Sequence, residues 1–341
     1  MAVLVTGANG FIAKYIVHDL LNEGYDVIGV VRSQAKADSL AKQFGGNPHL
    51  AVEVVHDIAV LGAFDSVFHK HGKNIDIVLH CASPLPSEGD DYEKTHMIPA
   101  VNGTIGILEA VKKYAAQTVK HVVITSSVVA VMDPAKRTDS TWILDEKNWC
   151  PLRKEDINGD FHVAYMVSKT YAERAAWEFL KNNRGEVKFE LTTLLPTYVF
   201  GPQLFEEDAL GSLNYSNGQV QALICSSPGE ELKPDMNAHF VDVRDVAKAH
   251  LLAFQKEEAA GKRLILTSCR YTSQDVVNIL NEKFPQLKGK ISEGPNPGKY
   301  DASSVVGEHH KAEEVLGIKY AGLEKSIYDT AAQVLKVELR L

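Results

Sequence analysis

The sequence has little cysteine, and its few cysteines are scattered. Cys81, Cys150, Cys225 and Cys269 are the four cysteines among 341 residues, and no two of them form a C-x-x-C pair. This spacing matches neither a zinc site nor a small disulfide framework. We therefore expect reduced, mostly buried thiols and no bound metal.

Long apolar runs and a charged leader segment are also absent. No apolar run reaches the roughly 20 residues that a membrane helix needs. Met1 runs directly into Ala2–Val5, which has the pattern of a strand and not of a targeting segment. We expect a cytosolic protein without a membrane partner.

The sequence lacks an excess of positive charge. It has 44 Asp and Glu against 36 Lys and Arg, a formal net charge of −8, and no clustered basic stripe. Such a chain repels a phosphate backbone, so we expect no nucleic-acid partner. With 45% hydrophobic and 23% charged residues, the composition is that of an ordinary globular protein of one large domain or two unequal ones.

The sequence does contain a regular alternation of apolar runs and helix-like segments. The strand pattern of Ala2–Val5 is followed by a glycine-containing turn and then by helical spacing over Phe11–Leu21. Buried strands that alternate with helices predict an α/β protein with a doubly wound, parallel sheet. The further strands that we expect are Asp26–Val31, Leu50–Asp57, Ile75–Cys81, His121–Ser127 and Phe189–Leu195.

The alternation weakens after Pro196, which predicts a smaller second lobe. Residues 203–238 are rich in Gly, Asn, Ser and Pro, and we expect irregular, substrate-contacting structure there. His239–Phe254 is expected to form a strand and a helix that return to the main domain. The predicted division is 1–195 plus 239–262 for the main domain, and 196–238 plus 263–341, mostly helical in its tail, for the lobe.

The turn after the first strand has the G-x-x-G-x-x-A pattern, in Thr6-Gly7-Ala8-Asn9-Gly10-Phe11-Ile12-Ala13. Gly7 allows a tight turn, Gly10 lets the backbone approach a pyrophosphate, and Ala13 permits close packing of helix on strand. Backbone N–H groups and the helix dipole then hold the phosphate charge. The pattern predicts a dinucleotide-binding Rossmann domain, and the alternative is a purely structural turn.

The end of the second strand indicates which dinucleotide binds. An NAD enzyme usually has an acid there, but this chain has Arg32, with Lys36 four residues later. Two cations fit the 2′-phosphate of NADP, although a solvated basic turn is the alternative. At the next two strand ends, Asp57 and Ile58 are expected near the adenine, and Leu79 and Cys81 along the sugar and pyrophosphate.

A Y-x-x-x-K pair opens a later helical segment. The spacing of four places Tyr165 and Lys169 on one helix face. At ~4 Å and an effective dielectric constant near 20, one ammonium contributes about 4 kcal/mol, which would lower the pKa of the tyrosine by up to roughly three units. The pair predicts a tyrosine that protonates a carbonyl oxygen after hydride transfer, with a lysine that assists it.

A serine at a strand end completes the expected catalytic set. Ser127 closes the strand from His121, at the carboxyl edge of the sheet where open α/β folds bind ligands. Its hydroxyl would hydrogen-bond the substrate carbonyl. Ser126 is the competing choice, because a shift of one residue turns the side chain to the other face. His80, at another strand end, is expected to be a core histidine.

Together these motifs resemble the extended short-chain dehydrogenase/reductase family, and within it the dihydroflavonol-reductase-like branch. The resemblance covers nearly the whole chain and includes, besides the segments above, His80–Pro84, Val101–Thr104, Pro196–Pro202 and Phe240–Ala247. Within the branch the chain is most similar to yeast NADPH-dependent reductases of methylglyoxal and other small carbonyls. We therefore expect NADPH-dependent reduction of small aldehydes, ketones or α-dicarbonyls.

The resemblance also implies roles for individual residues. Ser127, Tyr165 and Lys169 are the expected catalytic set, and Asn102 has either a proton-relay role or a structural one. The expected cofactor contacts are Gly7, Ala8, Asn9, Gly10, Phe11, Ile12, Arg32, Lys36, Asp57, Ile58, Leu79, Cys81, Tyr165, Lys169, Pro196, Val199 and Ser216. The expected substrate-facing positions, for which an ordinary core role is the alternative, are Leu85, Val128, Met132, Val163 and Tyr198.

Two other functions share these features. A hydroxysteroid dehydrogenase or a sugar-nucleotide epimerase has the same fold and Tyr–Lys pair, but an epimerase normally retains NAD, which Arg32 and Lys36 disfavour. A non-catalytic NADP-sensing protein is the second alternative, and retention of Tyr165 and Lys169 disfavours it. The sequence leaves a monomer and a homodimer open.

Overall fold

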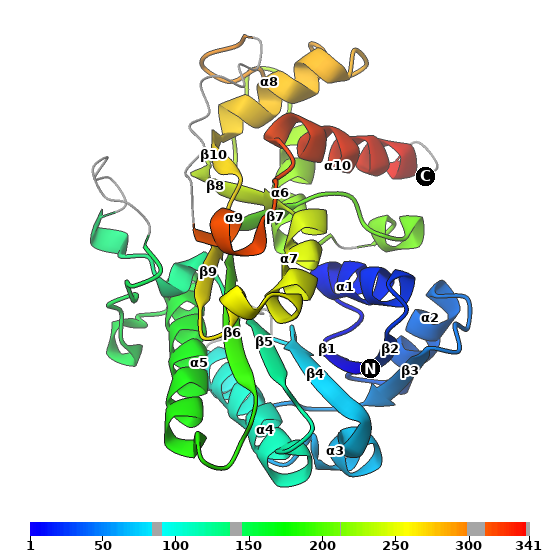
Figure 1. Cartoon of the computed structure of the whole chain (residues 1–341). Coiled ribbons are helices and arrows are strands. Elements are labelled where there is room, and N and C mark those ends of the chain that lie inside the picture. The colour runs from blue at the N-terminus through cyan, green and yellow to red at the C-terminus, as the bar shows by residue number, and fades with distance from the viewer. Residues whose placement is uncertain (84–90, 137–144, 212, 299–310, 339–341) are drawn as a thin grey trace. The chain divides into compact units, whose positions relative to one another are not determined.

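The chain divides into two compact units (Figure 1). The computed structural model describes residues 1–83, 91–136, 145–211, 213–298 and 311–338. Unit 1 consists of Met1–Leu195 and Lys248–Ile265, and unit 2 consists of Pro196–Ala247 and Leu266–Leu341. One of the boundaries between the units, between Ala247 and Lys248, falls inside a helix.

Unit 1 is built on a seven-stranded sheet of order β3-β2-β1-β4-β5-β6-β9. The pairs β1–β2, β2–β3, β1–β4, β4–β5 and β5–β6 are parallel, and the order runs outward in both directions from β1. This is the expected doubly wound sheet, which is confirmed. Its strands are β1 (Ala2–Thr6), β2 (Asp26–Val31), β3 (Leu50–Val54), β4 (Ile75–His80), β5 (His121–Thr125), β6 (Glu190–Pro196) and β9 (Arg263–Leu266).

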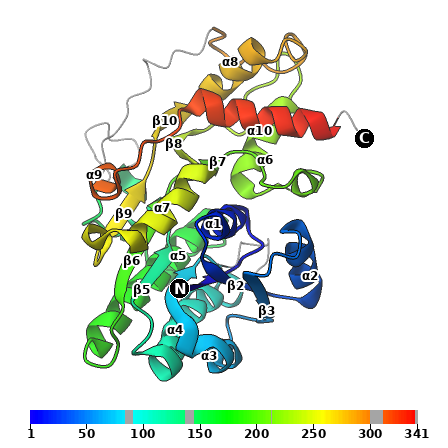
Figure 2. The ribbon, with the colours of Figure 1, turned by 45° about the vertical axis from the view of Figure 1, so that its right-hand side comes forward.

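Helices cover both faces of this sheet, which explains why its central strands are mostly apolar. All five residues of β1 are buried, because a parallel sheet between two helical layers has no solvated face. Figure 2 shows α1 and α2 on one side of the strands and α3 and α4 on the other. The helices are α1 (Phe11–Asn22), α2 (Gln34–Gln43), α3 (Asp65–His71), α4 (Ile98–Ala115) and α5 (Phe161–Asn183).

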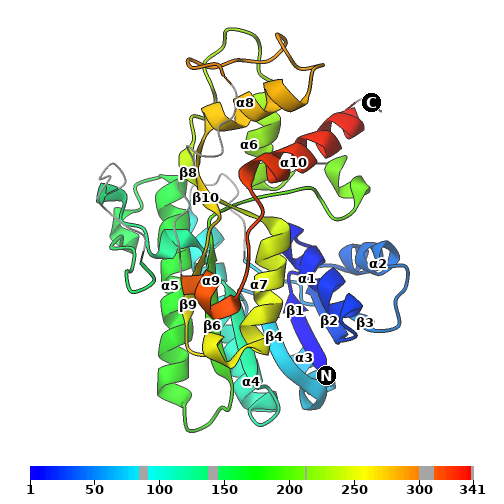
Figure 3. The same cartoon turned by 45° about the horizontal axis from the view of Figure 1, so that its top comes forward.

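Unit 2 has its own sheet and its own core. Strand β8 pairs parallel with β7 and antiparallel with β10. Helices α6, α8 and α10 lie beside these strands (Figure 3) and share one hydrophobic cluster that includes Phe200, Phe240 and Tyr271. The elements are β7 (Tyr198–Phe200), α6 (Tyr215–Ile224), β8 (Asn237–Asp242), β10 (Cys269–Thr272), α8 (Ser273–Lys283), α9 (Lys311–Leu316) and α10 (Leu323–Glu338). Helix α7 (Val243–Gln255) begins in unit 2 and continues in unit 1.

The structure differs from the expected organisation after residue 196. Residues 203–238 are not irregular throughout, because they include the helix α6. The apolar residues Val220, Leu223 and Ile224 of this helix are buried on one face. Residues 239–247 belong to unit 2, because β8 pairs with β7 and β10. Residues 263–265 belong to unit 1, because β9 is the edge strand beside β6. The pairing of strands that are distant in the sequence sets these boundaries, and a local sequence pattern does not reveal which strands pair.

Candidate active site

The candidate site lies at the carboxyl edge of the sheet in unit 1. Thr6, His80 and Ile124 are register partners near the ends of β1, β4 and β5, so the segments that follow these strands begin side by side. The Thr6 hydroxyl oxygen accepts the Ala82 N–H at 3.0 Å and lies 2.9 Å from His80 Nδ1. Burial lowers the pKa of His80 to about 3, so this ring is a neutral, hydrogen-bonded core group.

The glycine-rich turn has the geometry of a close backbone approach. Gly7 has φ +66°, and a Cβ built there would lie 3.0 Å from Ala82 Cα, so only glycine fits without strain. Gly10 caps α1, which has no acidic residue in its first turn. The helix dipole and the first N–H groups of α1 are therefore free of a capping carboxylate, which suits a phosphate group.

Three cations gather at the end of β2. The pKa of Lys36 is lowered, first by burial and then by the positive charges of Arg32 and Lys14. Arg32 is exposed, whereas Lys14 on α1 is buried. Repulsion among like charges is compensated by a phosphate, so this cluster fits the 2′-phosphate of NADP. The sequence analysis missed Lys14, because it lies within a helix and not at a strand end.

The other expected cofactor positions fall in both units. Asp57 is exposed and accepts the N–H of Ala59, Ile58 packs against the core, and Leu79 is fully buried, so a contact from Leu79 would come from its backbone. Cys81 is partly buried at the end of β4. Three expected contacts, Pro196, Val199 and Ser216, lie in unit 2.

Helix α5 positions the tyrosine and the lysine. Asp160 caps it, because its Oδ1 accepts the N–H groups of His162 at 2.7 Å and of Val163 at 3.2 Å. Tyr165 and Lys169 then lie one turn apart on the same helix face, as expected. Lys169 is buried and Tyr165 is half-buried, and burial penalises the charged form of each group.

Ser127 faces the phenol of Tyr165. Burial raises the pKa of Tyr165, and the Ser127 hydroxyl, which stabilises the charged phenolate, lowers it by less, so the net shift is upward. The expected lowering by Lys169 is wrong for this structure. The ammonium points instead to the Thr125 carbonyl oxygen, 3.4 Å from Nζ, and Tyr165 keeps its proton at neutral pH.

The lysine itself has a strongly perturbed pKa. Burial lowers the pKa of Lys169 to about 8, while the negative charges of Cys81 and Glu173 act in the opposite direction. The pKa of Cys81 is itself raised to about 11 by burial, so near neutral pH its thiol is uncharged and Glu173 is the effective anion. A lysine with such a pKa beside a tyrosine is typical of functional sites.

The neighbouring serine has a different partner. Ser126 Oγ donates to Glu173 Oε2 at 2.6 Å, so the two serines of this strand end point to different side chains of α5. Asn102, whose role was left open, donates from Nδ2 to the Ala59 carbonyl oxygen at 2.9 Å, which is a structural contact.

The expected substrate positions fall in both units. Val128 is buried in a cluster with Ala130, Val131, Leu195 and Ile265, and Met132 packs against that cluster. Val163 is partly buried on α5. Tyr198 lies in unit 2, with its ring 6.4 Å from that of Tyr215. Leu85 is outside the described residues.

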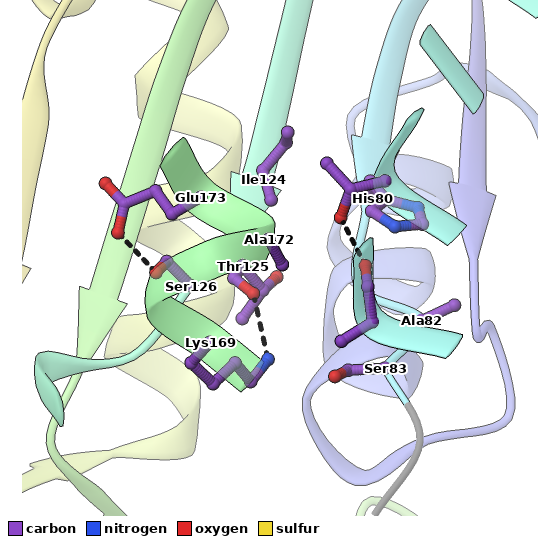
Figure 4. Close-up of a pocket in the computed structure, with 11 residues that line it drawn as sticks. His80, Ala82, Ser83, Ile124, Thr125, Ser126, Lys169, Ala172 and Glu173 are labelled. Carbon is purple, nitrogen blue, oxygen red and sulfur yellow. Dashed lines mark hydrogen bonds between the residues drawn. The ribbon is translucent and has the colours of Figure 1, made fainter. Parts of the chain in front are cut away.

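A small polar cavity adjoins the lysine (Figure 4). Its volume is about 20 Å³, and it is lined by Lys169, Glu173, Thr125, Ser126 and His80, among others. That volume accommodates one water molecule. The sequence analysis missed Glu173, although its position four residues after Lys169 places it on the same face of α5.

Comparison with known proteins decides the family. Residues 3–266 match the NAD dependent epimerase/dehydratase family. The chain belongs to this family. The NADPH-dependent methylglyoxal reductase of Saccharomyces cerevisiae is 51% identical over 344 residues, with the whole of both chains covered. The expected resemblance to the extended short-chain dehydrogenase/reductases is thereby confirmed.

Other members of the family support the same placement. A ketoreductase of Aspergillus niger is 31% identical over 337 residues, which cover 98% of this chain and 97% of the relative. The crystal structure of yeast methylglyoxal/isovaleraldehyde reductase complexed with NADPH matches with a TM-score of 0.94 and 49% identity over the whole of both chains. The similarity includes both units.

Two further observations concern metal and membrane. In the described ranges, no three His, Cys, Asp or Glu side chains form a group that could hold a metal ion. Across the same part of the chain, no helix has the length and apolar character needed to cross a membrane.

Proposed function

We propose that this protein is an NADPH-dependent reductase that converts small aldehydes, ketones or α-dicarbonyls to alcohols. The observation that carries the proposal is that the Ser127 hydroxyl lies beside the Tyr165 phenol, one helical turn from the buried ammonium of Lys169. The names of the relatives, an NADPH-dependent methylglyoxal reductase and a ketoreductase, are in accord with this chemistry.

The residues that would hold the cofactor follow from the site. The turn at Gly7 and the uncapped start of α1 would bind the pyrophosphate, and Arg32 and Lys36, with Lys14 behind them, would bind the 2′-phosphate. Asp57, Ile58, Leu79 and Cys81 are proposed at the adenine and sugars, with further contacts from Pro196, Val199 and Ser216. When bound, NADPH supplies a hydride to the carbonyl carbon.

Residues of the chain then supply the proton that the reduced carbonyl oxygen needs. Tyr165, which holds its proton at neutral pH, donates it to the carbonyl oxygen as negative charge develops there. The phenolate left behind is stabilised by the Ser127 hydroxyl, and Lys169, one helical turn away, is proposed as a cofactor contact. Proton transfer by a positioned side chain contributes about 10²–10⁴-fold to rate, so the tyrosine hydroxyl accounts for a large part of the acceleration.

Replacement of the proton donor tests this function. NADPH consumption is measured against a panel of aldehydes, α-dicarbonyls, ketones and hydroxysteroid-type ketones. We expect turnover of small carbonyls, and a loss of about 100-fold or more in kcat for Tyr165→Phe. Tyr171→Phe, on the same helix, is the matched control and retains wild-type rates. No NADPH consumption with any carbonyl, or full activity of Tyr165→Phe, would contradict the proposal.

The proposal also assigns a role to each unit and a cytosolic location to the protein. Unit 1 acts as the NADP-binding domain, and unit 2 supplies the substrate-binding lobe. The four cysteines are free thiols, which fits work in the reducing cytosol. The proposal holds for a monomer or a homodimer, because Ser127, Tyr165 and Lys169 come from one chain.

A further inference from the structure

Glu173, one helical turn after Lys169 on α5, forms a buried ion pair with Arg263. Glu173 is 1% exposed, and its Oε1 lies 2.6 Å from Arg263 Nε. The same carboxylate accepts hydrogen bonds from Ser126, Thr193 and Trp177, at 2.6, 2.8 and 3.3 Å. Glu173 is therefore held rigidly from the strands β5, β6 and β9 and from its own helix.

The arginine is held as firmly as the carboxylate. Arg263 Nη1 donates to the carbonyl oxygens of Glu146 and Asn148, both at 2.6 Å, and its guanidinium carbon lies 3.6 Å from the centre of the Trp149 ring. Burying two charges costs desolvation, and such a pair is often no more stabilising than apolar residues of the same volume. Stability alone is a weak reason for this pair.

Glu173 shares the small cavity with the lysine, and its carboxylate points toward Ser126 (Figure 4). Lys169 and Glu173 both line the cavity, on successive turns of α5 (Figure 4), whereas Arg263 does not. Glu173 is thus the nearer charge of the pair to the ammonium. A buried ammonium with a 3.4 Å contact to a carbonyl oxygen needs a compensating anion to stay charged.

The other ionisable groups around Lys169 do not provide that anion. His80 and Cys81, after β4, are uncharged at neutral pH, and Tyr165, on α5, keeps its proton. Among the described groups that line the cavity with Lys169, Glu173 is then the charged one, and its partner Arg263 lies outside the lining.

We propose that Glu173 is a positioning residue for the reduction, whose carboxylate, anchored by Arg263, keeps the Lys169 ammonium charged and in place beside Tyr165. The inference rests on the proposed function for its meaning in catalysis. The electrostatic coupling itself is measurable in the protein without cofactor or substrate.

The coupling is tested by titrating Lys169 directly. The full chain is labelled with [15N]lysine, the Lys169 signal is identified by its loss in Lys169→Met, and its titration midpoint is followed by NMR. In Glu173→Gln we expect the midpoint to move to lower pH by at least about half a unit, because a negative charge is removed. Glu178→Gln, an exposed position on α5, is the matched control and leaves the midpoint unchanged.

A double variant keeps the test decisive if Glu173→Gln does not fold. Glu173→Gln with Arg263→Gln removes both charges and leaves neither unpaired in the interior. We expect a shift in the same direction but smaller, because Arg263 is the more distant charge. An unchanged midpoint in the folded variants would overturn the proposal, and so would a shift to higher pH.

Turnover provides the second readout and separates the two proposals. In Glu173→Gln, the alkaline fall of kcat with pH should shift to lower pH together with the NMR midpoint. In Glu173→Asp, which restores the negative charge, it should shift back toward its wild-type position. Loss of kcat in Glu173→Gln without any shift of that alkaline fall would indicate a merely structural role and would refute the positioning role. A wild-type protein that reduces no carbonyl refutes the function, while the NMR titration still decides the coupling.

Discussion

At the scale of single residues, the cations at the end of β2 determine the choice of nucleotide. Charge-assisted hydrogen bonds to phosphate contribute about 1.5–3 kcal/mol, so Arg32→Ser should raise the KM for NADPH by about 10- to 100-fold. The KM for NADH should stay unchanged, because NADH has no 2′-phosphate. Initial rates with both nucleotides check this, with Lys42→Ser on α2, the helix that follows Arg32, as control. An equal change for both nucleotides would contradict a role of Arg32 at the phosphate site.

The lysine predicts a decline of activity in alkali. The pKa of Lys169 is about 8, so its charge is lost as the pH rises through that value, and the reduction rate should fall with it. The kcat profile between about pH 6 and pH 10 checks this. Lys169→Arg stays charged over the range, so its residual activity should lack the decline. A wild-type rate that is flat to the alkaline end would contradict the assignment.

The same group has a linked effect on folding. Because the folded-state pKa of Lys169 lies below its ordinary value of 10.5, the unfolded chain binds more protons between about pH 8 and 10.5. The cost of burying this charge is full below pH 8 and is relieved as the pH rises. In Lys169→Met that contribution to the pH dependence of the unfolding free energy should disappear, as measured by denaturant titration.

At the scale of elements, the turn from β1 to α1 depends on the missing side chain of Gly7. Gly7→Ala forces an L-residue into a left-handed conformation and brings its Cβ to 3.0 Å from the Ala82 backbone. Gly24→Ala has the same left-handed strain with nothing within 4 Å, so it isolates the close approach. We expect about 1 kcal/mol of destabilisation for Gly24→Ala.

Gly7→Ala should cost more than its control, in stability and in NADPH affinity, because the turn and the segment that follows β4 at Ala82 must separate. Thermal unfolding and NADPH titration by fluorescence measure the two effects. Equal destabilisation in both variants, with NADPH binding retained, would show that the close approach to Ala82 is unimportant.

At the scale of the whole molecule, unit 2 depends on a buried charge of its own. The Asp242 carboxylate is fully buried and pairs with Arg244 at 2.7 Å, and Arg244 also contacts Asp329 at 2.6 Å. Arg244→Met leaves a buried carboxylate without its cation and should cost about 3 kcal/mol. Lys325→Met, which removes an exposed partner of Asp329, should cost under about 1 kcal/mol. Equal unfolding midpoints would contradict this.

The sequence predicts the strands of the sheet and the residues of the site to different extents. The strands β1, β2 and β4 were predictable because a strand buried on both faces is apolar throughout, and the glycine pattern marks its own turn. The helix α6 was missed because its Asn, Ser and Gly residues resemble a loop, and its burial in unit 2 outweighs that composition. The Tyr165–Lys169 pair was found because its spacing is local.

The sequence by itself determined the fold class, the nucleotide turn, the cations after β2 and the residues of the expected catalytic set. These depend on neighbours in the chain, whose spacing sets the face of a helix or the end of a strand. Tertiary structure alone decided that Ser127 faces Tyr165 while Ser126 faces Glu173, that burial outweighs charge at Tyr165, and that Arg263 anchors Glu173. Desolvation and the pairing of side chains distant in sequence arise only when the chain is folded.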